Sequence, residues 1–395
     1  MSAIITSADS LKSLPIIRSL GKKGIYITTA DYKPSALGAA SKYSKSFFQY
    51  PSPAQTPLEF INALQKYLKK HQQEVLIPIH SQDTYIIAEY RQALQQFAKI
   101  PVHDYSIIKR VNDKGKLMLA AEQLGILIPQ TYQPGDINEV HHIADIIDYP
   151  AVIKLRNTSS SIGLSYAYCK EELISKFKKT IEKFRLPQTD YPLIQEYIEG
   201  DGCGVSVLFN DGDLRAKFTH KRLREYPISG GPSTYRVSIR DPKSEDAAIK
   251  LLKHFNWHGV AMVEFKLTKD NRPVLMEINP RFWGSINQAI QSGVDFPYLL
   301  YTMASEGDVE RVLNYKVGVK TKNLLTDYVA LMSYIKKTKN IRLLKEFAAL
   351  PHNDDIISLD DPVPLFRFIR RGIHEVCHPR QDKLKFCNNL SPALE

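Results

Sequence analysis

Several features that define other protein classes are scarce or missing from this chain of 395 residues. It has only four cysteines and no Cys-x-x-Cys pair, which argues against a disulfide-stapled secreted domain. No apolar run approaches the roughly 20 residues that span a bilayer. The opening sequence MSAIITSADS has no basic segment followed by a hydrophobic one, so no secretory signal is expected. The sequence therefore predicts a reduced, cytoplasmic protein that does not enter a membrane.

Recognition motifs for nucleic acid are also missing, although the net charge is +11. A basic excess can indicate nucleic-acid binding. Here the lysines and arginines are spread along the chain, with no RNP, zinc-finger or basic-arm motif. The excess suits an anionic small ligand equally well. We expect no nucleic-acid partner, and a basic nucleic-acid-binding protein stays as an alternative of a third class.

Two C-terminal patterns are discounted. The spacing of His374, Cys377, His378 and Cys387 fits no common zinc site. The basic, amphipathic segment 365–371 could touch a membrane surface, but such a helix more often packs its apolar face on its own domain.

The first hundred residues alternate short β-rich runs with helical patterns, which is typical of a parallel sheet with crossover helices. Strands are expected at 3–6, 25–28 and 75–79, with a helix at 58–70. The first strand is not followed by GxGxxG, so a dinucleotide site is not supported. His80 and Asp83 follow the third strand, at the edge where open α/β sheets bind ligands. A second substrate could lie there, although Ser81 or Asp83 could equally cap the next helix.

The stretch VLMEINPRFWGS at 274–285 carries Glu277, Asn279 and Arg281 at alternate positions. Alternate residues of a strand share one face, so an acid, an amide and a base meet there, while Met276 and the other intervening residues face away. The preceding run at 260–267 and the polar insert after it predict a hairpin.

A hairpin centred between Asp270 and Asn271 places Glu264 directly opposite Glu277. Opposed carboxylates about 5 Å apart repel each other. A cation between them would remove this cost, and two carboxylates with an amide oxygen suit Mg²⁺ that also holds phosphate. A half-exposed edge strand is the alternative, and a slip of one residue would turn Glu264 away.

Two lysines have surroundings suited to phosphate. Lys154 lies on an apolar strand at 150–155, and a small polar loop that closes at Gly163 follows the strand directly. Such a loop offers backbone N–H groups and hydroxyls to phosphate oxygens. Lys114 lies near the start of the main helix within 106–125. Taken alone, each lysine is better explained as a snorkelling side chain.

Together these elements resemble the ATP-grasp superfamily, over about residues 1–305. The order is Lys114 on a helix, Lys154 before a Ser-rich loop, the segment QEYIEG at 195–200, then Glu264 and the motif EINPR at 277–281. The IPIHSQDT segment and the C-terminal part look closest to the ATP-dependent carboligase branch, which resembles amino-acid and D-aspartate ligases. The resemblance implies an α/β chain in three parts: a Rossmann-like pre-ATP-grasp domain (1–105), an ATP-grasp domain of two α+β subdomains (106–305) and a mainly helical C-terminal extension (306–395).

The resemblance also implies residue roles, carried over position by position. The residues implied to bind the nucleotide phosphates are Lys114, Lys154 and the loop residues Ser159, Ser160, Ser161 and Gly163. The implied adenine hinge is Glu196, Tyr197 and Ile198, and Asp201 or Glu199 would contact the ribose. The implied metal ligands are Glu264, Glu277 and Asn279. Arg281 would hold the transferring phosphoryl group or the acyl phosphate. With that fold accepted, Lys221 and Arg222 are expected to contact an anionic substrate, because they precede a Gly-Gly loop; a basic exposed strand with a simple turn is the alternative.

The implied activity is ATP-dependent ligation of a carboxylate to an amine through an acyl phosphate, with ADP and phosphate released. The implied cofactors are ATP and Mg²⁺, with Mn²⁺ as a substitute, and the partners are a small carboxylate and a small amine. A homodimer is compatible with the resemblance. Carboxyphosphate chemistry, as in carbamoyl-phosphate synthases or biotin carboxylases, is the nearest alternative, and an ATP-binding regulator without turnover is the alternative of another class.

Overall fold

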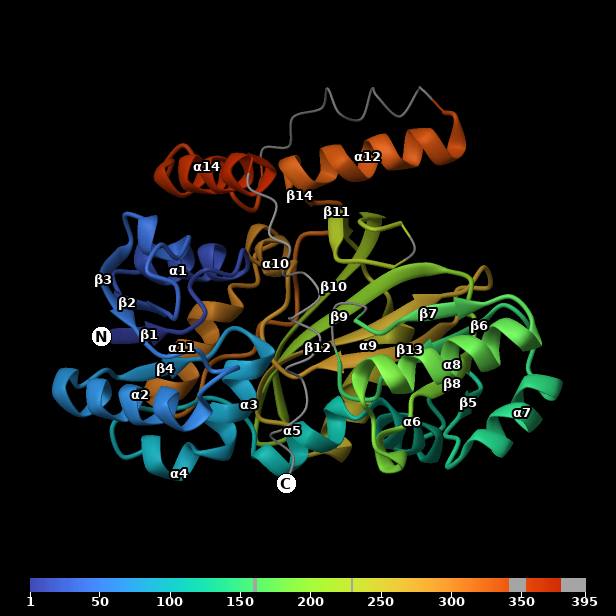
Figure 1. Cartoon of the computed structure of the whole chain (residues 1–395). Helices are drawn as coiled ribbons and strands as arrows, with labels where there is room; N and C mark the ends of the chain where they lie inside the picture. The colour runs from blue at the N-terminus through green and yellow to red at the C-terminus, as the bar shows by residue number, and fades with distance from the viewer. Residues whose placement is uncertain (159–161, 229, 341–352, 378–395) are drawn as a thin grey trace.

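The computed structural model describes residues 1–158, 162–228, 230–340 and 353–377, with side chains as far as residue 372. Figure 1 shows the chain as three bodies of sheet and helix, with the C-terminal helices above them. The predicted mixed α/β class is confirmed. The predicted serine positions 159–161, and His378 and Cys387, lie outside the described residues.

The N-terminal part forms a four-stranded parallel sheet in the order β3-β2-β1-β4. Its apolar strands are buried on both faces, as parallel sheets require. The expected strand at 75–79 is shorter, because Pro78 cannot donate a ladder hydrogen bond. The elements are β1 Ser2–Ile5, α1 Ser13–Lys22, β2 Tyr26–Asp31, η1 Gly38–Ala40, β3 Ser44–Gln49, α2 Pro57–His71, β4 Val75–Ile77, α3 Ser81–Glu89 and α4 Arg91–Leu94.

The middle part begins with two helices and a small antiparallel sheet in the order β5-β8-β6-β7. The expected helical segment is broken at Asp113, whose carboxylate accepts from the N–H groups of Gly115 and Lys116 and so starts the second helix. The elements are α5 Tyr105–Asn112, α6 Lys114–Gln123, β5 Thr131–Tyr132, α7 Ile137–Ile146, β6 Ala151–Lys154, β7 Ser165–Ala167, α8 Lys170–Phe184, η2 Gln188–Asp190 and β8 Leu193–Glu196.

A larger antiparallel sheet crosses the molecule in the order β13-β12-β9-β10-β11-β14. One face packs on the helices of the middle part and the other on α10 and α11, so the sheet has a core on each side. The elements are β9 Asp201–Asn210, β10 Asp213–Glu225, β11 Ser233–Ser238, α9 Pro242–His254, β12 Gly259–Leu267, β13 Pro273–Asn279, α10 Ile286–Gln291 and α11 Phe296–Glu306.

The C-terminal extension is less separate than the sequence suggests. It adds a strand, β14 Lys320–Lys322, to the large sheet, paired antiparallel with β11. Helix α12 (Leu324–Thr338) then packs against β10 and β11, and α14 (Val363–Cys377) packs against η1. The expectation of a mainly helical extension therefore misses β14, which is too short to give a period-two pattern.

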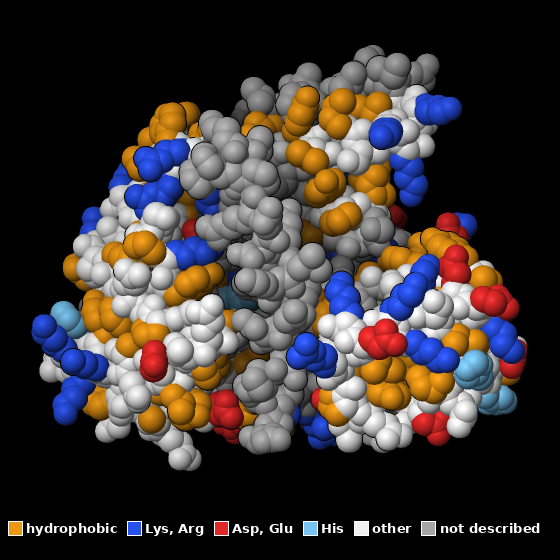
Figure 2. Space-filling view, viewed as in Figure 1, with side chains coloured by type: hydrophobic (Ala, Val, Ile, Leu, Met, Phe, Trp, Pro, Cys, Tyr) orange, Lys and Arg blue, Asp and Glu red, His pale blue; other side chains and the backbone are white. Residues whose placement is uncertain are grey.

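Basic and acidic side chains are mixed on the visible surface (Figure 2). Figure 2 shows Lys and Arg side chains on both halves of the visible face, interspersed with acidic and hydrophobic ones. Helix α12 exposes Tyr328, Val329 and Met332. Among the described residues, no helix is both long and apolar enough to cross a membrane.

Candidate active site

A cavity of about 870 Å³ lies where the three parts meet. The first domain supplies Lys12 and His80, the small sheet supplies Lys154, and β12 and β13 supply the hairpin residues. The acidic, basic and histidine side chains lining it are Lys12, His80, Lys114, Lys154, Glu196, His220, Arg222, Glu225, Glu264, Lys266, Glu277, Arg281, Lys337 and Asp355. Pockets of this size hold nucleotide-sized ligands.

The hairpin of β12 and β13 places Glu264 directly opposite Glu277, as predicted. The predicted turn was wrong by one residue, because Phe265 pairs with Leu275 and Leu267 with Pro273. A bulge at Met276 inserts one residue and restores the register at the two glutamates. The bulge also turns the Met276 side chain into the cavity, whereas the sequence placed it on the opposite face.

Each opposed carboxylate has a cation of its own. Arg222 donates to Glu264, and Lys114 lies 3.3 Å from Glu277. Burial and the facing Glu277 raise the pKa of Glu264, against the effect of Arg222. Burial opposes ionisation of Glu277 as well, but Lys114 and Lys154 outweigh it and lower the pKa of that carboxyl. Glu277 is therefore the carboxylate that is firmly ionised.

The donor set fits a hard divalent cation that shares its coordination with a ligand. Among the described residues no group of three or more His, Cys, Asp and Glu could hold a metal, so protein side chains alone do not complete a site. Glu264, Glu277 and Asn279 offer two carboxylates and one amide oxygen, which leaves positions for phosphate oxygens. At present the Asn279 amide nitrogen faces Glu264 at 2.9 Å and its oxygen accepts from Arg281 at 2.8 Å. Coordination by Asn279 would require its amide to rotate.

The two predicted nucleotide lysines lie on the same side of this hairpin. Lys114 is the first residue of α6, and its ammonium donates to the carbonyl oxygen of Thr158. Lys154 is the last residue of β6, and its ammonium lies 4.0 Å from the Met276 sulfur. Burial lowers the pKa of Lys154 to about 8, and the nearby Lys114 contributes in the same direction.

The loop after Lys154 is described only at its ends. Thr158 and Ile162 line the cavity. Gly163 has a φ of +71°, and a Cβ there would meet the Leu155 side chain at 2.3 Å, so only glycine fits. Gly163 is therefore required for the loop's course and does not itself line the cavity.

The predicted hinge residues Glu196, Tyr197 and Ile198 line the cavity, just beyond the end of β8. The Glu196 carboxylate accepts from the N–H of Gln130, which fixes the strand end. Neither acid considered for the ribose lines the cavity. Asp201 pairs with Lys221 at 2.6 Å, and Glu199 pairs with Lys269 at 3.0 Å, both on the surface.

The structure places the side chains of Lys221 and Arg222 on opposite sides of β10. Successive residues of β10 point to opposite faces, so His220 and Arg222 line the cavity and Lys221 does not. Lys221 instead pairs with Asp201 at 2.6 Å, and its contact with a substrate stays a prediction. Arg222 lies in the cavity, but it is held by Glu264 and by Glu225 at 3.3 Å. In this structure Arg222 therefore neutralises acidic side chains, which include the predicted metal ligand Glu264.

A hydrogen bond from Arg281 to Ser81 connects the site to the first domain. This side chain donates to Ser81 at 2.6 Å and to the Phe282 carbonyl at 2.8 Å. Ser81 is thus engaged by Arg281, and neither it nor Asp83 caps α3. Asp83 is buried and accepts from Ser7 at 2.6 Å and Tyr50 at 3.2 Å.

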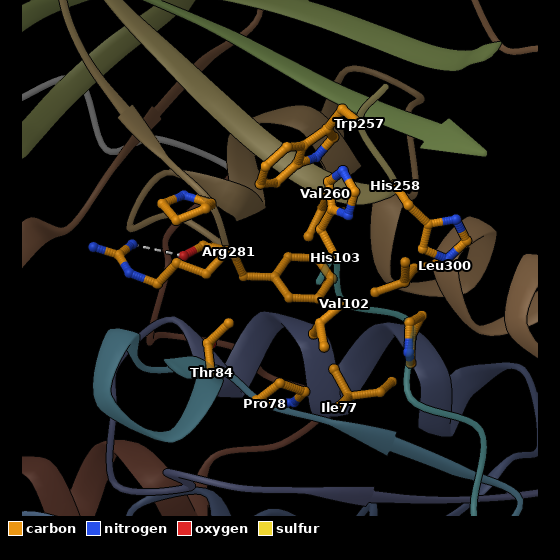
Figure 3. Close-up of a pocket in the computed structure, with 13 residues that line it drawn as sticks. Ile77, Pro78, Thr84, Val102, His103, Trp257, His258, Val260, Arg281 and Leu300 are labelled. Atoms are coloured by element: carbon orange, nitrogen blue, oxygen red, sulfur yellow. Dashed lines mark hydrogen bonds between the residues drawn. The ribbon is translucent and has the colours of Figure 1, made fainter. Parts of the chain in front are cut away.

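A second cavity lies behind Arg281, between β4, the 101–103 segment and β12 (Figure 3). It measures about 10 Å³, and His103 stands edge-on to Trp257 at its wall. A space of this size holds about one water molecule, so it cannot take a substrate.

Sequence reasoning missed several lining residues. Lys266 shares the inward face of β12 with Glu264, and its ammonium donates to the Gly200 carbonyl at 2.9 Å. The same alternation that indicated Glu264 could have indicated it. The extension contributes Asn323, Thr326 and Lys337, which no local pattern could connect to the site. Lys12 follows β1 in a segment with no known phosphate motif, and only the fold brings it to the cavity.

Comparison with known proteins agrees with this arrangement. Residues 188–326 match the family described as "ATP-grasp in the biosynthetic pathway with Ter operon". Formate-dependent phosphoribosylglycinamide formyltransferase of Ignicoccus hospitalis is 25% identical over 173 residues, 41% of this chain and 42% of that protein. D-alanine–D-alanine ligase of Bacillus pumilus is 23% identical over 202 residues, 44% and 51% of the two chains. The chain thus spans about half or less of the curated relatives it matches.

Solved structures resemble this one over most of its length. L-amino acid ligase of Bacillus licheniformis has a TM-score of 0.61 at 16% identity, covering 78% of this chain and 75% of that one. N5-carboxyaminoimidazole synthetase of Staphylococcus aureus, complexed with ADP, has a TM-score of 0.64 at 16% identity, covering 81% and 80%.

The biotin carboxylase domain of Hydrogenobacter thermophilus 2-oxoglutarate carboxylase, complexed with MgADP, ADP and bicarbonate, has a TM-score of 0.65 at 14% identity, covering 80% and 73%. At these identities the likeness establishes the fold. Residues 188–326 therefore match an ATP-grasp family, and the fold over most of the chain is similar to that of these ligases and carboxylases.

Proposed function

We propose that this protein is an ATP-dependent ligase that joins a carboxylate to an amine and releases ADP and phosphate. The observation that carries the proposal is the pair Glu264 and Glu277, opposed across a buried hairpin and surrounded by cations in one large cavity. Arg222 and Lys114 offset part of the repulsion between the two carboxylates, and a bound metal ion would remove the rest. The cavity's size and charge suit a nucleotide with its metal.

The expected reaction has two steps. An oxygen of the carboxylate attacks the γ-phosphorus of ATP, the bond to the bridging oxygen breaks, and ADP departs with the electron pair. The amine nitrogen then attacks the acyl carbon, the phosphate leaves, and the nitrogen gives up a proton. The protein's part is to position the reactants and to balance charge.

Individual residues supply these functions. Lys114 and Lys154 would hold the nucleotide phosphates, and the peptide groups of Tyr197 and Ile198 would meet the adenine edge. Arg281 would hold the oxyanion that receives the phosphoryl group. Glu264, Glu277 and a rotated Asn279 would hold Mg²⁺, or Mn²⁺ in its place, and the ion would neutralise charge on the phosphate oxygens.

Carboxyphosphate chemistry is the second candidate, in which bicarbonate replaces the carboxylic acid. The likeness to a biotin carboxylase domain solved with MgADP and bicarbonate favours keeping it. The same cavity serves both, since either substrate presents a planar oxyanion. An ATP-binding regulator is the remaining alternative, and the complete set of Lys114, Lys154, Glu264, Glu277 and Arg281 argues against it.

The test is phosphate release from Mg·ATP in the presence of pooled carboxylic acids and amines, with bicarbonate plus amines as a separate arm. Release that needs both an acid and an amine supports the ligase. Release that needs bicarbonate supports the second candidate. Mg·ATP binding without release in any arm supports a regulator, and no binding at all contradicts the whole proposal.

A further inference from the structure

A second group of cations lies at the end of the cavity formed by the first domain. Lys12 lies just before α1, lines the cavity and is only 8% exposed. Its ammonium donates to the Phe282 carbonyl oxygen at 3.3 Å. Arg281 donates to the same oxygen at 2.8 Å. One carbonyl therefore holds two cationic groups beside each other.

These two cations lack the direct ion pairs that the hairpin cations have, although Glu277 and Glu264 act on Arg281 from a greater distance. Lys114 pairs with Glu277 and Arg222 with Glu264, but no Asp or Glu of the described residues forms an ion pair with Lys12 or Arg281. Asp83 is the acid that acts on Lys12, and it is already engaged by Ser7 and Tyr50. Burial, and then the charge of Arg281, lower the pKa of Lys12 well below its usual value. An unpaired buried ammonium is destabilising unless a ligand supplies the negative charge.

His80 stands beside this pair. It lines the cavity directly after β4, at the carboxyl edge of the parallel sheet, where ligands of open α/β folds bind. The residue is exposed at the cavity surface, but desolvation by the surrounding protein, with the charges of Lys12 and Arg281, lowers the pKa of its imidazole to about 3. The imidazole is therefore neutral at physiological pH and offers a hydrogen bond without adding a third charge.

We propose that Lys12 and Arg281, with His80 beside them, bind the oxyanion that accepts the γ-phosphoryl group of ATP. This inference rests on the proposed function and names the part of the first domain that takes the acid substrate. Arg281 links the two sites, because it also donates to Asn279, two residues from Glu277. An anion between Lys12 and Arg281 would thus lie next to the proposed metal and phosphate groups. The oxyanion belongs either to a carboxylic acid or to bicarbonate.

The experiment measures anion binding without knowledge of the true substrate. The thermal unfolding midpoint is recorded with Mg·ADP present, during titration with sodium acetate or sodium bicarbonate, with sodium chloride added to keep ionic strength constant. Wild type should show a saturable rise with one or both anions. Lys12→Met should weaken the apparent affinity about tenfold or more, and Lys12→Arg should restore most of it. The exposed Lys69→Met, on α2 of the same domain, should behave as wild type.

Each outcome decides a separate point. An acetate response assigns the site to carboxylic acids, and a response to bicarbonate alone assigns it to carboxyphosphate chemistry. Unchanged affinity in Lys12→Met, or no anion response in a wild type that Mg·ADP stabilises, overturns this inference and leaves the proposed function standing. A wild type that Mg·ADP does not stabilise counts against the proposed function itself. His80→Ala, expected to weaken the affinity about threefold, gives the same readout if Lys12→Met does not fold.

Discussion

Buried charge is arranged in opposite ways in the cavity and at the seam where the C-terminal extension meets the rest of the chain. At the seam, acids and bases are matched one to one: Arg18 with Asp361, Arg224 with Asp327, and Arg236 with Asp355. In the cavity each glutamate also has a cation, Arg222 or Lys114, but like charges face one another as well, with Glu264 opposite Glu277 and Lys12 beside Arg281. Matched pairs hold a structure together, whereas facing like charges are tolerated where a ligand completes them.

The largest effect expected from this contrast is on turnover. Glu277→Gln should lower phosphate release by about 10³-fold or more, because it removes the firmly ionised metal ligand while keeping the side chain's shape. Its thermal midpoint should stay close to that of wild type. Phosphate release and unfolding are measured on the same preparations. A variant with wild-type turnover would show that Glu277 does not hold the metal.

Substitutions at the seam should instead change the free energy of unfolding. Asp327 accepts from Arg224 at 2.9 and 2.7 Å and from Thr234 at 2.9 Å, all buried. Asp327→Asn leaves the Arg224 charge uncompensated and should lower the free energy of unfolding by about 3 kcal/mol. Denaturant unfolding measures this change. A loss below about 0.5 kcal/mol would mean that the matched pairs do not hold the extension.

Glu264→Gln provides the matching change in the cavity. It removes the ion pair with Arg222 but also the repulsion from Glu277, and Arg222 keeps its pairing with Glu225. The two effects oppose each other, so the free energy of unfolding should change by less than about 1 kcal/mol. The same denaturant measurement applies. A loss as large as that of Asp327→Asn would make Glu264 a structural residue.

A smaller effect is expected from protonation of Lys154. Its pKa of about 8 means that the free protein carries this lysine partly neutral at pH 8 and charged at pH 6.5. A bound phosphate raises the pKa, so nucleotide binding should take up a fraction of a proton at pH 8 and almost none at pH 6.5. Calorimetry of ADP binding in two buffers of different ionisation enthalpy detects the uptake. Lys154→Met should abolish it, and equal uptake in the variant would assign it to another group.

The sequence predicted the opposed glutamates for reasons that were only partly right. The alternation of charge in EINPR is local and strong, so the shared face of Glu277, Asn279 and Arg281 could be read directly. The turn position was off by one, and the bulge at Met276 that restores the pairing has no local signature. Register depends on both strands and on the turn between them, which a single strand's pattern does not contain.

The positions of other cavity residues could not be predicted from the sequence, for a physical reason. Lys221 and Arg222 are neighbours, and only the orientation of β10 decides which one faces the cavity. Lys12 and Asn323 come to the site from the two ends of the chain. Their positions depend on how the first domain and the extension pack on the large sheet, and local propensity carries no information about that packing.

The most direct test of the central account is the metal dependence of ADP binding, because it needs no knowledge of the acid or the amine. ADP affinity is measured by calorimetry with and without Mg²⁺, for wild type and for the double variant Glu264→Gln, Glu277→Gln. We predict that Mg²⁺ strengthens ADP binding about tenfold or more in wild type and has no effect in the variant, which still binds ADP alone. The same Mg²⁺ dependence in both proteins would contradict the account, because the facing carboxylates would then not be the metal site.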